Sequence, residues 1–249
     1  MTVLILIKRN IKLFFKDKGM FFTSLITPAI LLILYVTFLS NIYRDSFLAG
    51  FPAGMPVPEV DIGGLVATQL ISSMLAVSCV TVAFCSNFLM VQDRVTGAIR
   101  DLRISPVKPA ALSLSYYVAT LVSTLLICYA ATAICLIYVA VVGWYLSVAD
   151  VFRLLLDVLL LVLFGTALSS VVNFFLSTQG QISAVGAIVS AGYGFVCGAY
   201  MPISSFGEGL QTAIGFLPGT YGTSLIRNHA MQGAFAELGT QGLPTEAVG

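Results

Sequence analysis

Long apolar runs separated by short polar segments dominate the chain. About 20 consecutive apolar residues cross a bilayer as a helix, so the pattern predicts membrane-spanning helices rather than a soluble core. Five such runs are present, at residues 20–40, 63–91, 110–142, 151–176 and 182–199. The pattern therefore predicts an all-α fold, a polytopic bundle of transmembrane helices that forms one domain over residues 1–249.

The segment before the first run is amphipathic. Residues 3–16 place apolar side chains on one helical face and basic side chains on a neighbouring one. The basic residues are Lys8, Arg9, Lys12 and Lys16. This pattern is typical of a helix that lies in the headgroup plane, so we expect residues 1–18 to form an interfacial helix. A cleaved signal peptide is the alternative, but no small-residue cleavage site follows the next apolar run.

The apolar pattern breaks after Ala199. The next apolar pieces are too short to span a bilayer and are punctuated by glycine and proline, as in a re-entrant or interfacial hairpin. Pro202, Pro218 and Tyr221 mark this hairpin. We expect residues 200–249 to form an outer hairpin followed by a polar tail, with no sixth span.

Composition and charge indicate the class of protein and its orientation in the membrane. The chain is 58% apolar and only 9% charged, whereas soluble domains carry about 25% charged residues. The net charge of +1 gives no general attraction to nucleic acid. Nine of the twelve Lys and Arg residues lie in residues 1–18 and 92–109. The positive-inside rule therefore predicts a multi-pass protein of the cell membrane whose N-terminus is cytoplasmic.

No motif points to catalysis. The sequence has no GxxxxGK[ST], HExxH or GxSxG pattern. The single histidine, His229, falls in the expected polar tail, where a solvated side chain is the simplest interpretation. The five cysteines all lie in apolar runs without a CxxC pair and are expected to be small core residues. No catalytic residue, metal site or cofactor is predicted, which disfavours an integral-membrane enzyme.

Small residues recur at every fourth position of the run at residues 182–199. They are Gly186, Ser190, Gly194 and Gly198. Such a stripe allows helix backbones to approach closely in lipid. Packing within the bundle and contact at a subunit or translocation interface both remain open.

Polar residues in the run at residues 151–176 are also informative. Asn173 is a candidate for an interhelical hydrogen bond. Arg153 and Asp157 stand four residues apart and are expected to neutralise each other near the outer surface. No span shows the deeply placed acid or base that a proton relay needs, which argues against an ion-coupled carrier.

The loop at residues 92–109 is rich in charge. Arg100 and Arg103 share one helical face, while Asp93 and Asp101 offer local partners. A solvated loop that follows the positive-inside rule is one interpretation. The other is a short helix that docks on a soluble partner and ends before Pro106.

Two motifs carry a resemblance to a known family. The segment Asp93-Arg94-x-x-Gly97…Leu102-x-x-Ser105-Pro106 resembles the acidic-Arg-x-x-Gly…Ser/Thr-Pro stretch of the type-2 family of ATP-binding-cassette (ABC) exporter permeases. The later pattern Gly198-x-x-x-Pro202, Pro218-x-x-Tyr221 and Arg227 is similar to the family's Gly/Pro-rich hairpin. Asp93 stands where the family commonly has Glu. The resemblance covers essentially the whole length.

The resemblance implies a permease subunit that works with partners. These are a separate cytoplasmic ABC ATPase, which grips the loop as a coupling helix, and a second permease subunit, identical or different. Catalysis then belongs to the ATPase chain, and the exported substrate is an amphiphile such as a drug, lipid or polysaccharide. Membrane lipid is a further partner, and nucleic acid is not. A secondary carrier or channel without an ATPase is the alternative.

The resemblance also implies roles for individual residues. ATPase coupling is assigned to Asp93, Arg94, Gly97, Arg100, Asp101, Arg103, Ser105 and Pro106. The translocation or dimer interface is assigned to Gly186, Ser190, Gly194 and Gly198. The family has six spans, so we expect either that this sequence is part of a longer chain or that a sixth helix comes from elsewhere.

Overall fold

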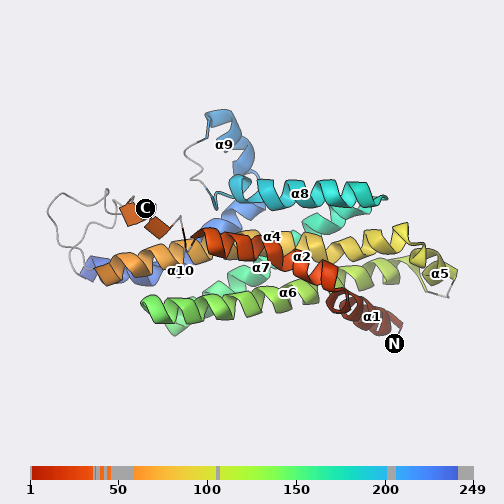
Figure 1. Cartoon of the computed structure of the whole chain (residues 1–249), viewed down its shortest axis with the longest axis horizontal. Helices are drawn as coiled ribbons and strands as arrows, with labels where there is room; N and C mark the ends of the chain where they lie inside the picture. The colour runs from red at the N-terminus through yellow and green to blue at the C-terminus, as the bar shows by residue number, and fades with distance from the viewer. Residues whose placement is uncertain are drawn as a thin grey trace.

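The chain folds into an elongated bundle of helices. The computed structural model describes residues 2–35, 37, 40–41, 44–45, 59–104, 107–200 and 206–240. These residues contain no strand, which confirms the all-α prediction. The helices are α1 (Thr2–Lys16), α2 (Lys18–Leu34), α4 (Glu59–Val95), α5 (Ala98–Ile104), α6 (Pro109–Val142), α7 (Val148–Phe174), α8 (Gln179–Val196), α9 (Glu208–Gly215) and α10 (Pro218–Thr240). Both α1 and α5 lie at one end of the bundle (Figure 1).

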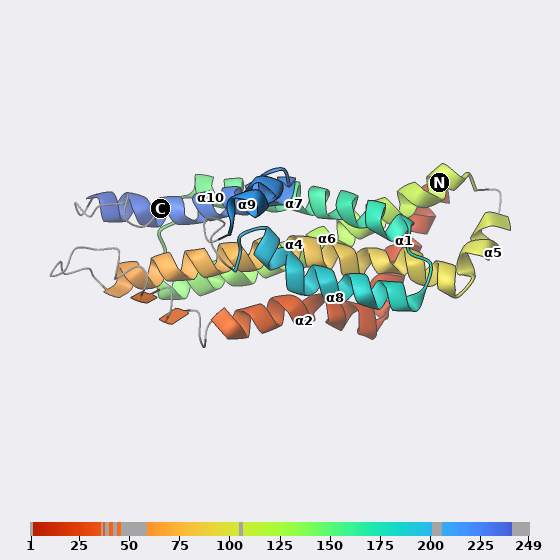
Figure 2. The same cartoon turned by 90° about the horizontal axis from the view of Figure 1, so that it is seen from above.

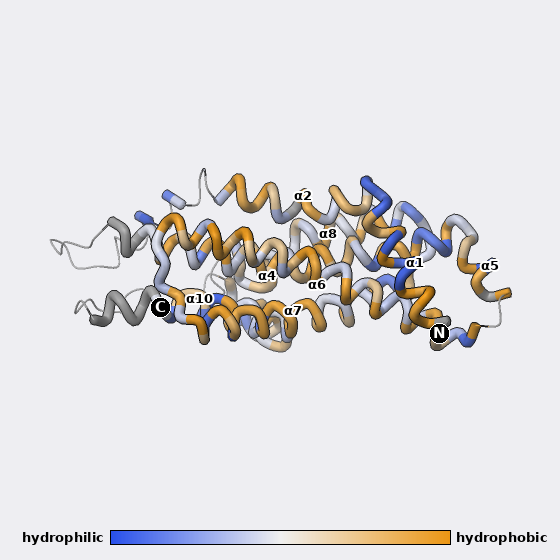
Figure 3. Tube along the Cα trace, turned by 90° about the horizontal axis from the view of Figure 1, so that it is seen from below, coloured by the Kyte–Doolittle hydropathy of each residue, from blue (hydrophilic) through white to orange (hydrophobic). Residues whose placement is uncertain are grey.

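The helix α4 is the centre of the bundle. It contacts α2, α6, α7, α8 and α10, and Figure 2 shows it between α2 and α8 on one side and α7 and α10 on the other. In its most apolar window 89% of the residues are buried, compared with 28% for α6 and 39% for α7. The outer helices therefore carry the lipid-facing surface, and Figure 3 shows how strongly apolar the long helices are.

Local sequence signals fix where several helices begin. Asp17 caps α2, because its side chain accepts a hydrogen bond from the backbone nitrogen of Met20 at 3.1 Å. Capping boxes start α7 at Ser147 and α8 at Thr178. In each box the cap side chain and the residue three positions later satisfy backbone donors that have no partner within the helix. These caps fix the first residues of α7 and α8, directly after the short connections that precede them.

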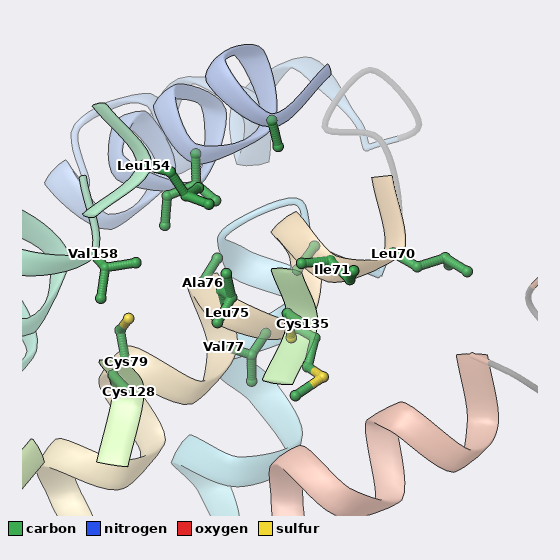
Figure 4. Packing of buried hydrophobic residues seen from close by; sticks show 14 of the residues in the cluster. Leu70, Ile71, Leu75, Ala76, Val77, Cys79, Cys128, Cys135, Leu154 and Val158 are labelled. Carbon is green, nitrogen blue, oxygen red and sulfur yellow. The ribbon is translucent and has the colours of Figure 1, made fainter. Parts of the chain in front are cut away.

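Apolar contacts between α4, α6 and α7 form the main core. Figure 4 shows Leu75 and Val77 of α4 in this cluster, with Val158 contributed by α7. Cys79 of α4 lies beside Cys128 of α6. All five cysteines are buried and free, in keeping with a packing role. Close packing of this kind, rather than water exclusion alone, holds helices together in lipid.

Asn87 supplies a polar link across the same three helices. Its Nδ2 donates to Oγ of Ser169 at 3.1 Å and to Oγ of Ser170 at 3.0 Å. The Oγ1 of Thr120 on α6 lies 3.5 Å from its Oδ1. Asn173, which the sequence favoured for such a role, is buried, but its side-chain amide has no hydrogen-bond partner among the described residues. The interhelical amide hydrogen bonds are therefore made by Asn87 of α4 and not by Asn173 of α7.

Among the residues that the structure describes, three helices are long and apolar enough to cross a membrane. They cover residues 63–95, 109–142 and 148–174, which match three of the predicted spans. The pair α1–α2 passes the same test as a bent unit with an angle of 72°. The predicted spans at residues 20–40 and 182–199 correspond to α2 and α8 and stay predictions as membrane crossings.

The segment after Ala199 differs from the expected hairpin and polar tail. A short helix, α9, is followed by the long helix α10, which packs along α4 and α7. Small residues allow this approach: a side chain at Gly222 would lie 2.7 Å from Leu161 of α7. Hydropathy missed α10, because glycine and threonine occupy part of its packed face and Ile226 is among its few large buried side chains. Of the marked hairpin positions, Pro218 begins α10, Tyr221 is 62% exposed, and Pro202 lies outside the described residues.

Candidate functional site

The predicted coupling segment forms a short helix at the basic end of the bundle. After α4 ends, Gly97 adopts a φ of +84°, and α5 follows at once. A residue with a side chain is strained in this left-handed conformation. A Cβ at Gly97 would have no atom within 4 Å. Backbone conformation, rather than crowding, therefore favours glycine at this turn.

Asp93 lies in the last turn of α4, just before this turn, and forms hydrogen bonds with residues of two other helices. Its Oδ2 accepts a hydrogen bond from Nη1 of Arg9 on α1 at 2.9 Å and from the hydroxyl of Tyr116 on α6 at 2.5 Å. The Asp93 side chain is 9% exposed and that of Arg9 is 31% exposed. Two donors for one shielded carboxylate are the arrangement that makes such burial tolerable.

A second layer of contacts orients Arg9. The same Nη1 donates to Oδ1 of Asn10 at 2.8 Å, and Nδ2 of Asn10 lies 3.5 Å from Oγ of Ser115 on α6. Partial burial on its own lowers the pKa of Arg9, but the hydrogen bond and charge of Asp93 outweigh it and raise that pKa overall. Arg9 therefore stays a cation at any physiological pH.

Arg94 fastens the loop to a further helix. Its Nη1 donates to the carbonyl oxygens of Phe174 at 2.7 Å and Leu176 at 3.1 Å, at the C-terminal end of α7. Its guanidinium carbon also lies 5.6 Å from the centre of the Phe174 ring. A cation at this end of a helix satisfies carbonyls that have no partner within the helix. Two consecutive residues thus join the base of α5 to α1, α6 and α7.

The helix α5 presents the remaining predicted coupling residues. Arg100 and Asp101 are exposed, and Ile104 is 84% exposed. Leu102 packs inward against a cluster of buried residues that includes Tyr116. The structure describes the backbone but not the side chain of Arg103, and Ser105 and Pro106 lie outside the described residues. The predicted set therefore divides into buried anchors and an exposed face.

The small-residue stripe of α8 also divides into two parts. Gly186 and Ser190 line a cavity of about 750 Å³ between α2 and α8, with Phe88 of α4 in its wall. Gly194 instead packs inside the chain, because a Cβ there would lie 2.1 Å from the ring of Tyr200. Gly198 turns the chain with a φ of +71°, and its carbonyl accepts a hydrogen bond from Nη2 of Arg227 at 2.7 Å.

Charged residues at the far end pair differently from the sequence expectation. Arg153 donates to Asp150 at 3.0 Å and to Oε1 of Gln232 at 3.3 Å, so the expected Arg153–Asp157 pair is wrong. Asp157 instead lies 2.5 Å from Nδ1 of His229 on α10. The expectation of a solvated His229 is wrong as well, because α10 brings its ring against α7. Spacing within one helix could not reveal a partner on another.

Comparison with known proteins identifies the family. The family model described as "ABC-2 type transporter" matches residues 1–230. No curated protein and no solved structure matches the chain. Within the described residues, no group of three or more His, Cys, Asp or Glu side chains could hold a metal ion.

Proposed function

Because the chain belongs to the ABC-2 type transporter family, we propose that this membrane permease subunit exports an amphiphile with energy from a separate ATPase. The subunit itself is a transport component and not an enzyme. The observation that carries the proposal is the division of the coupling segment. The exposed helix α5 follows shortly after Asp93 and Arg94. These two adjacent side chains bind to three other helices.

This arrangement suits the transfer of motion from a cytoplasmic partner. The exposed face of α5, with Arg100, Asp101 and Ile104, would contact the ATPase. A displacement of α5 would then pull on Asp93 and Arg94, and through them on α1, α6 and α7. Since α4 is packed against most of the bundle, it would carry the displacement toward the outer side. The N-terminus and α5 would both be cytoplasmic.

The cavity between α2 and α8 supports an amphiphilic substrate. Its wall at one end carries the polar side chains of Asp17, Gln92 and Gln179, while Ile26 and Ile30 of α2 continue it along the helix. A molecule with a polar head and an apolar body fits such a graded surface. We propose further that the subunit pairs with a second permease subunit, and that Gly186 and Ser190 would face the path between the two.

Association with an ATPase tests the proposal directly. The double variant Arg100→Glu/Arg103→Glu should insert normally but lose co-purification with an ABC ATPase subunit from the native membrane. Lys18→Glu, which reverses another exposed cation near the same end of the bundle, should retain that subunit. Retention of the ATPase by the double variant would remove α5 from its proposed role.

One observation favours the alternative of a carrier without an ATPase. Asp157 is buried and paired with His229, so the bundle does contain an ionisable pair between α7 and α10. Ionisable residues within membrane helices are frequent in proton pathways. Transport into vesicles by the Asp157→Asn variant separates the two functions: ATP-driven uptake should persist, whereas proton-driven uptake should be abolished.

A further inference from the structure

Three lysines form an exposed ridge on the N-terminal helix. Lys8, Lys12 and Lys16 of α1 are spaced four residues apart, and all three side chains are exposed. Residues at this spacing lie above one another on one face of a helix. We call these three residues the lysine ridge. Their ammonium groups create a continuous strip of positive charge along about two turns of the helix.

No acidic side chain in the described part of the chain forms an ion pair with the ridge. Two acids lie close to α1 and already have hydrogen-bond partners: Asp93 binds the inward-pointing Arg9, and Asp17 caps α2. On α1, Arg9 therefore points into the protein, while the three lysines face outward. Their positive charge can attract an anionic ligand outside the chain.

Apolar side chains accompany the ridge on the exposed surface. Leu4 is 75% exposed, Ile5 66% and Phe15 37%. The opposite face of α1 is already occupied, because Leu6 and Phe14 are buried in the bundle. An exposed surface that combines lysines with large apolar residues matches the boundary between headgroups and acyl chains. The bend of 72° between α1 and α2 is what a helix needs to follow this boundary while its neighbour crosses the bilayer.

We propose that the lysine ridge binds the headgroups of anionic phospholipids, with Leu4, Ile5 and Phe15 contacting their acyl chains. Each lysine near an anionic membrane surface raises affinity by up to about five-fold. Lipid bound at this site would also affect the base of α5. Arg9 extends from the same helix to Asp93, so a bound lipid would steady the helix that holds this carboxylate. Lipid binding itself does not require the ATPase of the proposed function.

Competition between two lipids in the purified full-length chain tests this site. Native mass spectrometry in mild detergent, with equimolar phosphatidylglycerol and phosphatidylcholine, reports which lipid remains bound. The wild-type chain should retain phosphatidylglycerol with a preference of roughly ten-fold or more, given three lysines at up to about five-fold each. Added salt should weaken that preference, because it screens exposed charges.

Two variants separate charge from structure. Lys8→Gln/Lys12→Gln/Lys16→Gln should reduce the preference to near one, whereas Lys8→Arg/Lys12→Arg/Lys16→Arg should preserve it. An unchanged preference in the glutamine variant would overturn the proposal. So would a wild-type chain that shows no preference, or a glutamine variant that keeps its lipid and instead loses a soluble protein partner. Failure to find an ATPase would contradict the proposed function without affecting this result.

Discussion

Arg9 and Asp93 lie 84 residues apart in the sequence, yet Nη1 of one is 2.9 Å from Oδ2 of the other. The contact joins the amphipathic N-terminal helix to the base of the segment that precedes α5. Tyr116 completes the arrangement from α6. Asp93 is therefore a positioning residue: it sets the place of α5 and does not belong to the surface that α5 offers.

Removal of Arg9 should destabilise the chain by leaving Asp93 shielded from water with one donor fewer. Hydrogen bonds to charged groups contribute about 1.5–3 kcal/mol, so Arg9→Ala should lower the free energy of unfolding by roughly that amount. Denaturation in detergent micelles measures the change. Lys12→Ala, on an exposed face of the same helix, is the matched control and should have little effect.

A double-mutant cycle shows whether the two residues interact. Arg9→Ala combined with Asp93→Ala should cost less than the sum of the two single variants, because each single variant already breaks the same contact. Strictly additive costs would show that Arg9 and Asp93 contribute independently, contrary to the geometry.

Gly97→Ala should be destabilising through the backbone alone. The position has positive φ and open space around the missing side chain, and a non-glycine residue in this region costs roughly 1–2 kcal/mol. Thermal unfolding compares it with Gly180→Ala, a position in α8 that also has open space but lies in a regular helix. The control should be neutral or slightly stabilising. Equal behaviour of the two variants would contradict the role of the turn.

Gly194→Ala should disturb the contact between α8 and Tyr200. The new methyl group would meet the ring at 2.1 Å, and overpacking of this kind typically costs about 1–3 kcal/mol. Gly192→Ala, on the same helix with no atom within 4 Å, should not. Tyr200→Ala in the Gly194→Ala background should restore part of the lost thermal stability. If it restores none, the ring is not the obstacle.

The pair Asp157–His229 should contribute more to stability than the pair Asp150–Arg153. The side chains of Asp157 and His229 are 5% and 26% exposed, whereas those of Asp150 and Arg153 are 9% and 50% exposed. Loss of a buried partner costs about 1–3 kcal/mol, while exposed ion pairs contribute at most about 1 kcal/mol. Unfolding of His229→Ala and Arg153→Ala gives the comparison. A larger effect of Arg153→Ala would contradict the burial argument.

Hydropathy was sufficient for much of the fold. It placed the long helices α4, α6 and α7 within a few residues of their observed ends, because continuous apolar runs allow few alternatives. It failed for α10, whose packed face combines the small residues Gly222, Thr223 and Ala230 with few large apolar side chains, such as the buried Ile226. Small residues bury well between helices but contribute little to an apolar average. Within residues 218–240 small residues recur at four-residue spacing only in isolated pairs such as Gly219 and Thr223, which is too little to mark a helix face.

The candidate site was predictable by location and not by partners. The charges and the Ser105-Pro106 stop singled out residues 92–109. The turn at Gly97 was not predicted. Arg9 was visible only as one of several cations, and nothing in the sequence distinguishes it from Lys8 or Lys12. Tyr116 looked like any aromatic residue of a span. Contacts between helices depend on rotation and tilt, which a single sequence leaves undetermined.

The central position of α4 has a consequence for biosynthesis. This helix carries hydroxyl groups at Ser72, Ser73 and Ser78 that are buried only because other helices cover them. Its covering helices α6, α7 and α10 are all translated later. Until they arrive, the nascent α4 must expose these hydroxyl groups to the insertion machinery or to lipid. The hydroxyl groups of α4 are therefore shielded only once the later helices have packed against it, and not when α4 itself inserts.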